Sequence, residues 1–477
     1  MLASAKPPWA HSRQYLPRTV RLFSYRFSDT PMSADAFYLV LKQRLKDGEW
    51  SAGQRLPSIR KLVSTTGASY HSVVTACARL VSEGALEASP GRGYFVAGRA
   101  GKTAVARGPD TMAGEPLFKL LQAGPDYTKL GCGWLPPSWR DTDLLAKAIR
   151  RTARLEQSSL AEYGEISGYL PLRKQLSLYL QRRTRIDVAP SQIITTLGAT
   201  QGMDLVARLL VQPGDHVFVD EPGNGNLIKL IQLAGGHVVG IRRTESGPDI
   251  AEMQSHLATH RVKAFFCNST FHNPTGGNIT AHNAFQVLRL AVEHDFHVIE
   301  DDVYGDFSPA VRQTFAELDD LQRVIYIGSF SKCLSASLRV GYIACAQALI
   351  EPLTRLKLFT CVAVPAFCER FVNTILVDGT YAGHMKQIQH KLVTQQALTQ
   401  RALRNRGWQF EIAPQGGMFL WAHHPDLADL GDLIDTLARQ KILLMPGSAF
   451  SVTRDYRRYA RINCTHFTPA VEAYFAI

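Results

Sequence analysis

A single lysine, Lys332, follows a strand-like apolar run, Val324–Phe330, and two side chains that suit an anion flank it. Ser329 precedes the lysine by three residues and Arg339 follows it by seven. A lysine amine can form a Schiff base with a cofactor such as pyridoxal 5′-phosphate (PLP), while hydroxyl and guanidinium groups can hold a phosphate. The alternative is a solvated loop lysine beside an ordinary surface arginine. The cofactor site is favoured because its other parts occur elsewhere in the chain.

Three more runs place polar residues directly after strand-like segments. The run GATQ at 198–201 opens a helix whose free N–H groups suit an anion, although such turns are common. Asn273 in the turn NPTG can hydrogen bond to a phenolic oxygen, or the run is simply a Pro-Gly turn. In EDDVY, 300–304, a buried carboxylate would keep a pyridine nitrogen protonated, so that the ring acts as an electron sink. A solvated acidic loop is the alternative there.

The elements that must position these residues are about seven β-rich segments, mostly separated by amphipathic helices such as 201–211 and 281–293. The strand candidates are Ile193–Leu197, His216–Val219, His237–Ile241, Ala264–Cys267, His297–Glu300, Val324–Phe330 and Arg339–Cys345. This alternation predicts an α/β module with a mostly parallel sheet. Ligands of such sheets bind beyond the carboxyl ends of the strands, where the polar runs lie.

Length and composition indicate a protein of several domains with a basic N-terminal part. The 477 residues are 45% hydrophobic, which is enough for two or three domains with a large core. The net charge is +12, and the first 97 residues hold 13 Lys and Arg against 6 Asp and Glu, which favours a nucleic-acid partner there. Eight scattered cysteines indicate reduced thiols of a cytoplasmic protein, without disulfides or a metal site. No apolar run approaches the ~18 residues of a membrane helix.

Residues 33–98 have the pattern of a winged helix-turn-helix. The apolar residues Phe37, Leu39, Val40, Leu41 and Leu45 predict a first helix that carries them on one side. Ser58 and Ser69 are good N-caps for helices at 59–65 and 70–83, and the second of these would read the major groove. A strand-turn-strand at 86–96 makes the wing. The candidate DNA contacts are Arg60, Ser69, Tyr70, His71, Ser72 and Arg92. A small helical domain without a DNA role is the alternative.

Two segments lack the pattern of a folded domain. Residues 1–32 are rich in arginine, and their composition resembles an organellar transit peptide. We favour instead a disordered basic tail or a mis-assigned start, with Met32 as the true initiator. Residues 99–127, dominated by Gly, Ala, Pro and basic residues, predict a flexible linker, and residues 128–477 form the large module.

The small module resembles the winged-helix domain of GntR-type regulators. The resemblance rests on LPSIRKL at 56–62, AS at 68–69, EG at 83–84 and PGRGYFV at 90–96. It implies binding to double-stranded DNA. The family often has basic residues where Tyr70 and Thr75 stand here, so individual base contacts and the operator sequence are not carried over.

The large module resembles fold type I PLP enzymes of the class I/II aminotransferase superfamily, over about residues 128–475. The resemblance implies PLP as cofactor, with Lys332 forming the internal aldimine and Asp301 pairing with the ring nitrogen. Tyr304 and Asn273 would touch the phenolic oxygen. The residues that would hold the phosphate are Ala199, Thr200, Ser329 and Arg339.

Three further positions carry the resemblance or depart from it. Tyr163, in the pattern YG-x3-G-x2-PLR, resembles the tyrosine that reaches the phosphate of the neighbouring subunit, which implies a homodimer. Arg461 in ARIN resembles the arginine that clamps an α-carboxylate, and a surface salt-bridge arginine is the alternative. Asn224 stands where the family usually has an aromatic residue that stacks on the pyridine ring, so this stacking is expected to be absent.

The combination of the two modules resembles the MocR-type subfamily of bacterial regulators. It implies a transcriptional regulator that senses PLP, or its adduct with an amino acid or amine effector, through aldimine formation at Lys332. A working aminotransferase that carries a winged-helix domain is the second hypothesis. A plain DNA-binding repressor with a vestigial cofactor site is the third, and the intact set of Lys332, Asp301, Asn273 and Arg339 argues against it. The missing aromatic at Asn224 argues mildly against the second.

Overall fold

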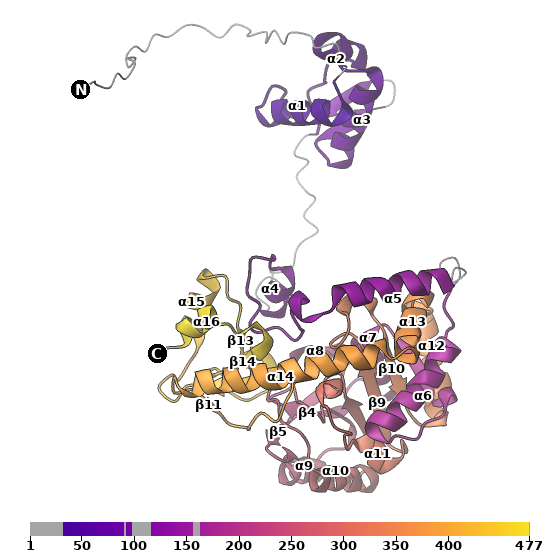
Figure 1. Cartoon of the computed structure of the whole chain (residues 1–477), viewed down its shortest axis with the longest axis vertical. Coiled ribbons are helices and arrows are strands. Elements are labelled where there is room, and N and C mark those ends of the chain that lie inside the picture. Colours follow the sequence, from indigo (N-terminus) through magenta and orange to yellow (C-terminus); the bar gives the residue numbers. More distant parts are fainter. Residues whose placement is uncertain (1–31, 90–91, 98–115, 156–162, 477) are drawn as a thin grey trace, which may run out of the picture. The chain divides into compact units, whose positions relative to one another are not determined.

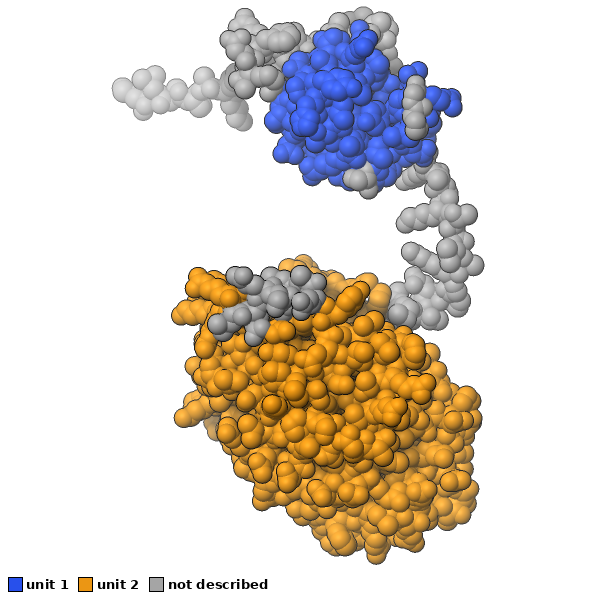
Figure 2. All heavy atoms as spheres, turned by 90° about the vertical axis from the view of Figure 1, so that its right-hand side faces the viewer, with its two compact units in different colours: residues 1–110 blue, residues 111–477 orange. Residues whose placement is uncertain are grey.

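The computed structural model describes residues 32–89, 92–97, 116–155 and 163–476. The chain divides into two compact units, Met1–Asp110 and Thr111–Ile477 (Figures 1 and 2). The N-terminal tail and most of the predicted linker, residues 1–31 and 98–115, lie outside the described residues. Each unit is therefore described by itself.

The small unit contains three helices and a two-stranded antiparallel sheet. Its elements are α1 (Ala34–Lys46), α2 (Ile59–Thr66), α3 (Tyr70–Ser82), β1 (Leu86–Ser89) and β2 (Gly93–Val96). The hydroxyls of Ser33, Ser58 and Ser69 each accept the backbone N–H three residues further on, which is the usual start of a helix. Both predicted helices of the helix-turn-helix and both strands of the wing are confirmed.

The core of the small unit corrects one detail of the first helix. Phe37 and Leu41 of α1 are buried against Leu80 of α3, as the apolar pattern predicts. Leu39 and Val40 were predicted to lie on the same side, but they are 63% and 42% exposed. A helix advances about 100° per residue, so Leu39 lies about 180° from the middle of the face that Phe37 and Leu41 share, and Val40 lies about 80° from it, at the edge of that face.

The large unit is built on an eight-stranded sheet with strand order β3-β10-β9-β8-β7-β4-β5-β6. The strands are β3 (Ile193–Thr196), β4 (His216–Glu221), β5 (His237–Thr244), β6 (Gly247–Pro248), β7 (Val262–Cys267), β8 (His297–Asp301), β9 (Val324–Ser329) and β10 (Gly341–Ala344). Strands β9, β8, β7, β4 and β5 are parallel, whereas β10 and β6 run antiparallel to their neighbours. All seven predicted strands are present, and the mostly parallel sheet is confirmed.

Helices cover this sheet and a second, smaller sheet follows it. The helices are α4 (Pro116–Gln122), α5 (Thr142–Leu155), α6 (Leu170–Thr184), α7 (Gly198–Leu210), α8 (Gly225–Leu233), α9 (Ile250–Leu257), α10 (Ala281–Glu293), α11 (Phe315–Asp319), α12 (Gln347–Cys361), α13 (Ala366–Val377), α14 (Thr380–Arg404), α15 (Gly431–Arg439) and α16 (Pro469–Glu472). The smaller sheet is antiparallel, in the order β11-β12-β14-β13, with β11 (Gln409–Phe410), β12 (Phe419–His423), β13 (Met445–Pro446) and β14 (Tyr459–Asn463). Helix α7 packs against β9 and β10 of the large sheet, and α4 packs against β13 of the smaller one.

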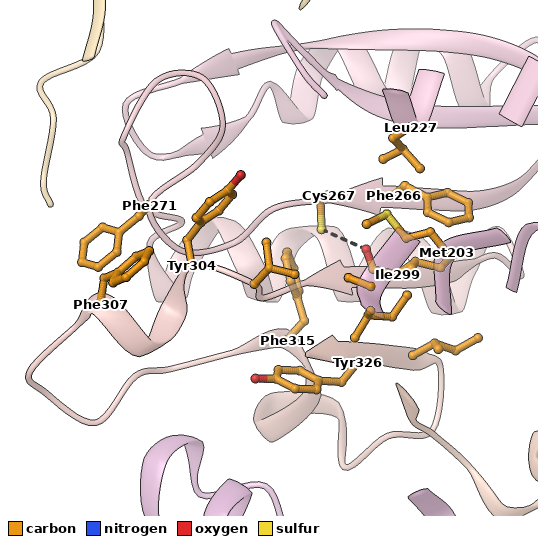
Figure 3. Packing of buried hydrophobic residues seen from close by; sticks show 14 of the residues in the cluster. Met203, Leu227, Phe266, Cys267, Phe271, Ile299, Tyr304, Phe307, Phe315 and Tyr326 are labelled. Carbon is orange, nitrogen blue, oxygen red and sulfur yellow. Dashed lines mark hydrogen bonds between the residues drawn. The ribbon is translucent and has the colours of Figure 1, made fainter. Parts of the chain in front are cut away.

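The hydrophobic core continues from the sheet to the loops at the carboxyl ends of its strands (Figure 3). Phe266 and Ile299 lie on neighbouring strands and are fully buried, and the Cys267 thiol donates to the Ile299 carbonyl at 3.8 Å. The Tyr304 ring lies 5.0 Å from the Phe419 ring of the smaller sheet, nearly perpendicular to it. Packing therefore fixes Tyr304 at the junction of the two sheets.

The predicted linker, residues 99–127, is folded from Pro116 onward. Leu120 of α4 is 1% exposed and packs in a cluster with Trp421, Met445 and Phe450. Beyond the helix, the N–H of Thr128 donates to the Lys441 carbonyl at 2.8 Å. The sequence signal was the apolar run at 116–121, which is too short to show a helical period.

Two further properties concern the described residues alone. None of their helices is long and apolar enough to cross a membrane, and they contain no group of three or more His, Cys, Asp or Glu that could hold a metal ion. All eight cysteines are free thiols.

The packing of α4 yields a test with a matched control. Leu120→Ala should lower the free energy of unfolding of the large unit by about 2–5 kcal/mol, because it leaves a cavity in a packed cluster. Leu121→Ala, at a side chain that is 61% exposed, should change it by less than about 0.5 kcal/mol. Urea unfolding of both variants measures the difference. Equal effects at the two positions would show that α4 is not anchored in this way.

Candidate functional site

Seven of the predicted site residues line one cavity of about 130 Å3 in the large unit. These residues are Ala199, Thr200, Asn273, Asp301, Tyr304, Lys332 and Arg461. They come from the start of α7, the ends of β7, β8 and β9, and from β14. The carboxyl ends of the parallel strands therefore do meet at one site, as the strand pattern predicts.

Lys332 is the amine of this cavity. Burial lowers its pKa from 10.5 to about 8; the Arg461 and Arg339 cations act in the same direction, and Asp301 opposes them. At neutral pH about a tenth of the amine is then uncharged, compared with well under a thousandth for an ordinary lysine. An uncharged amine can attack an aldehyde, so the cavity prepares Lys332 for Schiff-base chemistry.

The acidic run at 300–302 is buried, which excludes a solvated loop. Glu300 accepts the N–H groups of Phe315 and Ala316, at 3.1 and 3.0 Å, at the start of α11. Asp302 pairs with the Arg312 guanidinium and accepts the Tyr326 hydroxyl. Asp301 alone of the three faces the cavity.

Asp301 fits the role of partner to a protonated ring nitrogen. Its carboxylate accepts the Val303 N–H at 3.3 Å, and burial raises its pKa to about 7, with a smaller contribution from Asp302. A buried carboxylate whose ionised form is disfavoured would be stabilised by a cation brought into the cavity. The pyridinium of PLP is such a cation.

Asn268 organises the ends of three strands, and the sequence analysis missed it. Its side-chain amide donates to the Asp301 carbonyl at 2.7 Å and accepts the Asn273 N–H at 2.8 Å. Its own N–H donates to Asp220, at the end of β4, at 3.0 Å. The signal was a polar residue placed directly after the buried strand β7.

Arg461 is a buried guanidinium without a carboxylate partner among the described residues. It donates to the Asn273 side-chain carbonyl at 2.7 Å and to the Gly131 carbonyl at 2.6 Å. Its guanidinium carbon lies 4.7 Å from the ring centres of both Phe419 and Phe450, and burial lowers its pKa to about 10. The Nε atom is buried without a hydrogen-bond partner. The surface salt bridge is therefore excluded, and the group is suited to an incoming carboxylate.

Ser329 and Arg339 lie beside the start of α7 and are not among the residues that line the cavity. Arg339 donates to the Leu197 carbonyl at 2.9 Å, and the hydroxyl of Ser329 accepts the Ser331 N–H at 3.2 Å. Gly198 has a φ of +76°, and a Cβ there would lie 2.9 Å from the Arg339 Nη2 atom. Glycine thus lets the guanidinium approach the helix N-terminus, an arrangement that suits a phosphate.

Asn224 lines the cavity and caps α8, where its side chain accepts the Asn226 N–H at 3.2 Å. A second cavity of about 360 Å3 shares Leu117, Asn224, Asn226 and Arg461 with the first. The first cavity is also lined by Gly133, where a Cβ would lie 3.7 Å from the Lys332 Nζ atom. The sequence analysis did not single out Gly133 or Leu117.

Tyr163 lies apart from the other predicted residues. Its side chain is 90% exposed, and it is not among the residues that line the Lys332 cavity. The predicted role of Tyr163 toward a neighbouring subunit stays a prediction.

The small unit exposes most, but not all, of the predicted DNA contacts. Arg60, Arg92 and His71 are exposed, and Tyr70 is 62% exposed at the start of α3. The hydroxyl of Ser69 caps α3. The prediction for Ser72 is corrected: its side chain is 8% exposed, and its hydroxyl accepts that of Ser69 at 2.9 Å. Ser72 therefore serves the helix start and is not available to a base.

The lowered pKa of Lys332 generates a prediction for cofactor capture. The rate at which cofactor-free protein captures PLP should rise about tenfold between pH 7 and pH 9 and then level off, because the uncharged amine saturates above a pKa of about 8. Stopped-flow absorbance measures this rate. Borohydride should then fix the cofactor to the wild type and not to Lys332→Ala. A rate that keeps rising in proportion to hydroxide up to pH 10 would contradict the lowered pKa.

Comparison with known proteins agrees with this geometry. Residues 125–476 match the family model of class I and II aminotransferases, and residues 34–96 match that of bacterial regulatory proteins of the gntR family. The uncharacterized HTH-type transcriptional regulator YjiR of Escherichia coli is 27% identical over 91% of this chain and 95% of its own length. The probable rhizopine catabolism regulatory protein MocR of Rhizobium meliloti is 25% identical over 76% of this chain and 75% of its own.

A solved structure shows the same fold for the large unit. The kynurenine aminotransferase of Pyrococcus horikoshii, in complex with PMP, superposes with a TM-score of 0.69 and 25% identity. The match covers 76% of this chain and 91% of that one. The cofactor of this fold is PLP, which the cavity fits. The chain belongs to the class I and II aminotransferase family, and its added gntR-family domain gives it the architecture of the MocR-type regulators.

Proposed function

We propose that this protein is a PLP-dependent transcriptional regulator that binds double-stranded DNA and senses PLP or an amino compound at Lys332. The observation that carries the proposal is the presence, in one chain, of a gntR-family winged helix and of a cavity lined by an amine, a carboxylate and a guanidinium that has no carboxylate partner among the described residues. When bound, PLP supplies an aldehyde that exchanges between amines and a ring that withdraws electrons.

The residues of the cavity have distinct tasks in this proposal. Lys332 provides the amine that an amino acid or amine effector displaces, and its pKa of about 8 makes the exchange accessible near neutral pH. Asp301 holds a proton at the ring nitrogen. Arg461 binds the effector's carboxylate in a fork of two N–H groups. The start of α7, Ser329 and Arg339 bind the phosphate, and Tyr304 and Asn273 contact the phenolic oxygen.

Helix α4 supports a route from the cavity toward the DNA-binding unit. Leu117 of α4 lines the Lys332 cavity, and α4 is the first described element after the segment that leads from the winged helix. An effector that fills the cavity contacts this helix and changes the stability of its packing. A ligand shifts an equilibrium only by its difference in affinity for the two states, so the effector must bind one packing of α4 better than the other.

The proposal includes a homodimer that acts in the cytoplasm. The exposed Tyr163 is free to reach the phosphate of a second subunit, and two winged helices on one particle would bind a paired or repeated site more tightly than one.

DNA binding provides the test of the small unit. Arg60→Ala and Arg92→Ala should each weaken binding and reduce the slope of log affinity against log salt by about one, because each variant removes one cation that neutralises a phosphate. Arg289→Ala, an exposed arginine of α10 in the large unit, is the control and should bind as the wild type does. Fluorescence anisotropy with DNA selected from a random library measures both quantities. If all three variants bind alike at modest salt, the assigned DNA face is wrong.

The same assay tests the sensing step. A panel of amino acids and amines, added to PLP-loaded protein, should change the DNA affinity of the wild type and leave that of Lys332→Ala unchanged. An effector response that persists in Lys332→Ala would show that sensing occurs elsewhere.

An active aminotransferase is the second candidate, supported by the intact cavity and by the fold. Asn224 distinguishes the two, because proton transfer at the substrate's Cα needs a well-positioned ring and small misplacements reduce the rate steeply. We expect effector-induced spectral changes but turnover far below the ~10 per second typical of enzymes.

Asn224→Tyr should raise the turnover, because Asn224 lines the Lys332 cavity and an aromatic ring at this position would stack on the pyridine ring and hold it in place. Asn224→Ala is the control, since it removes the same helix cap without adding a ring. Single-turnover conversion of PLP to its amine form measures the rate. Wild-type turnover near ~10 per second would make the aminotransferase the better assignment.

A further inference from the structure

A third cavity of the large unit, about 450 Å3, lies between the two sheets and shares no lining residue with the Lys332 cavity. One wall comes from the large sheet and its loops, with Pro222, Arg242, Arg243 and Thr275. The other wall comes from the smaller sheet and the segment before β14, with Glu411, Ile412, Trp421, Arg454, Asp455, Tyr456, Arg458 and Tyr459. A ligand here would contact both sheets at once.

The walls of this cavity carry buried donors without acceptors. Four N–H groups are buried and have no hydrogen-bond partner in the part of the chain that the structure describes: Nη2 of Arg243, Nε1 of Trp421, Nε of Arg454 and Nε of Arg458. The side chain of Arg243 and the whole of Trp421 are each only 1% exposed. Buried polar groups are nearly always paired, and all four of these can only donate. A ligand that pairs them must bring acceptors.

Arg243 is fixed in place by bonds on its other side. Its Nη1 atom donates to Asp220 at 3.1 Å and to the Asn268 carbonyl at 3.2 Å. This rigid guanidinium keeps its second amino group for the cavity, where the planar fork of an arginine matches the geometry of a carboxylate or phosphate.

Of the four arginines that line the cavity, Arg458 is the one that has no carboxylate partner among the described residues. Arg242 lies 3.5 Å from Asp249, and Arg454 pairs with Glu252. Arg458 instead donates to the Pro425 carbonyl at 3.5 Å.

Two acids also line the cavity, and both have partners. Asp455 is held by the neighbouring Arg457, at 2.8 Å. Glu411 hydrogen bonds to Tyr459, and burial together with the Glu411 charge raises the pKa of that phenol to about 12. Arg457 therefore offsets the Asp455 charge, whereas Glu411 keeps its own, so the case for an anion rests on the four buried donors of the walls.

We propose that this cavity binds a small oxyanion, a carboxylate or phosphate group, which bridges Arg243 of the large sheet and Arg458 beside the smaller one. The site differs from the carboxylate clamp at Arg461, because the two cavities have no lining residue in common. Its occupant acts as a second ligand of the aminotransferase-like unit.

Hydrogen bonds connect this site with the residues around the cofactor. Arg243 contacts Asp220, Asp220 accepts the N–H of Asn268, and Asn268 holds both Asp301 and Asn273. Neutralising charge at Arg243 would therefore be felt at Asp301 through bonds of 2.7–3.1 Å. This coupling rests on the proposed function, whereas anion binding itself does not.

The test compares two arginines in the full chain loaded with PLP. Inorganic phosphate and succinate are titrated by calorimetry at constant ionic strength, against chloride as reference. R458Q should bind at least about tenfold more weakly than the wild type, because it lacks a charge-assisted hydrogen bond. R439Q should bind as the wild type does, since Arg439, the last residue of α15, is exposed and lies outside the cavity lining.

The design separates this site from the cofactor site. Phosphate at the start of α7 or succinate at Arg461 would bind R458Q and R439Q equally, so only a difference between these variants reports the new cavity. A preference for phosphate or succinate identifies the oxyanion, and the comparison can be repeated after PLP is removed. The proposal is overturned if neither anion binds at millimolar concentration, or if R458Q binds as tightly as R439Q.

Discussion

The arrangement of this protein's large unit depends on one residue, Asn268. Three parallel strands, β4, β7 and β8, end at the same edge of the sheet, and Asn268 joins all three ends. Its side-chain amide pairs the Asp301 carbonyl and the Asn273 N–H, and its own N–H donates to the Asp220 carboxylate. Buried polar groups of this kind are costly when unpaired, so the network fixes the strand ends against one another. The cavity around Lys332 is a consequence of that fixed edge.

The electrostatics of the cavity follow from burial rather than from pairing. Lys332 and Arg461 have lowered pKa values and Asp301 has a raised one, and in each the largest cause is desolvation. The protein thus keeps two donors and a carboxylate in a state where their charged forms are disfavoured. A ligand with complementary charges, such as a phosphorylated pyridine bearing a carboxylate, would relieve all three at once. Binding affinity and a change in protonation are therefore expected to occur together.

The sequence was sufficient to predict the helix-turn-helix, most strands of the large sheet and the polar residues that follow those strands. Central strands of such a sheet carry continuous apolar runs because both of their faces are buried, and these runs located seven of the eight strands of the large sheet. The two-residue β6 and the four strands of the smaller sheet were not predicted. The buried state of Asp301 and Arg461 could be expected only through the family resemblance, since an isolated acidic run or arginine is more often solvated. Leu39, Val40 and Ser72 show the limits of local pattern. Leu39 and Val40 are apolar, but their positions along the helix leave them exposed, and Ser72 is polar but is buried beside the Ser69 cap. Asn268 and α4 were missed because their roles arise from contacts more than 30 residues away in the chain, with Asp301 and Trp421.

Helix α4 links the Lys332 cavity with the packing of the smaller sheet. Its Leu117 lines the cavity and its Leu120 is buried in the cluster with Trp421, so one seven-residue helix takes part in both. A helix this short is not stable by itself, and its order depends on those contacts. In the proposed regulator, an effector that changes the contact at Leu117 by about 1.4 kcal/mol would change the population of the packed form about tenfold. Regulation at that scale would require no large movement of the sheet, only a difference in how firmly this helix is held.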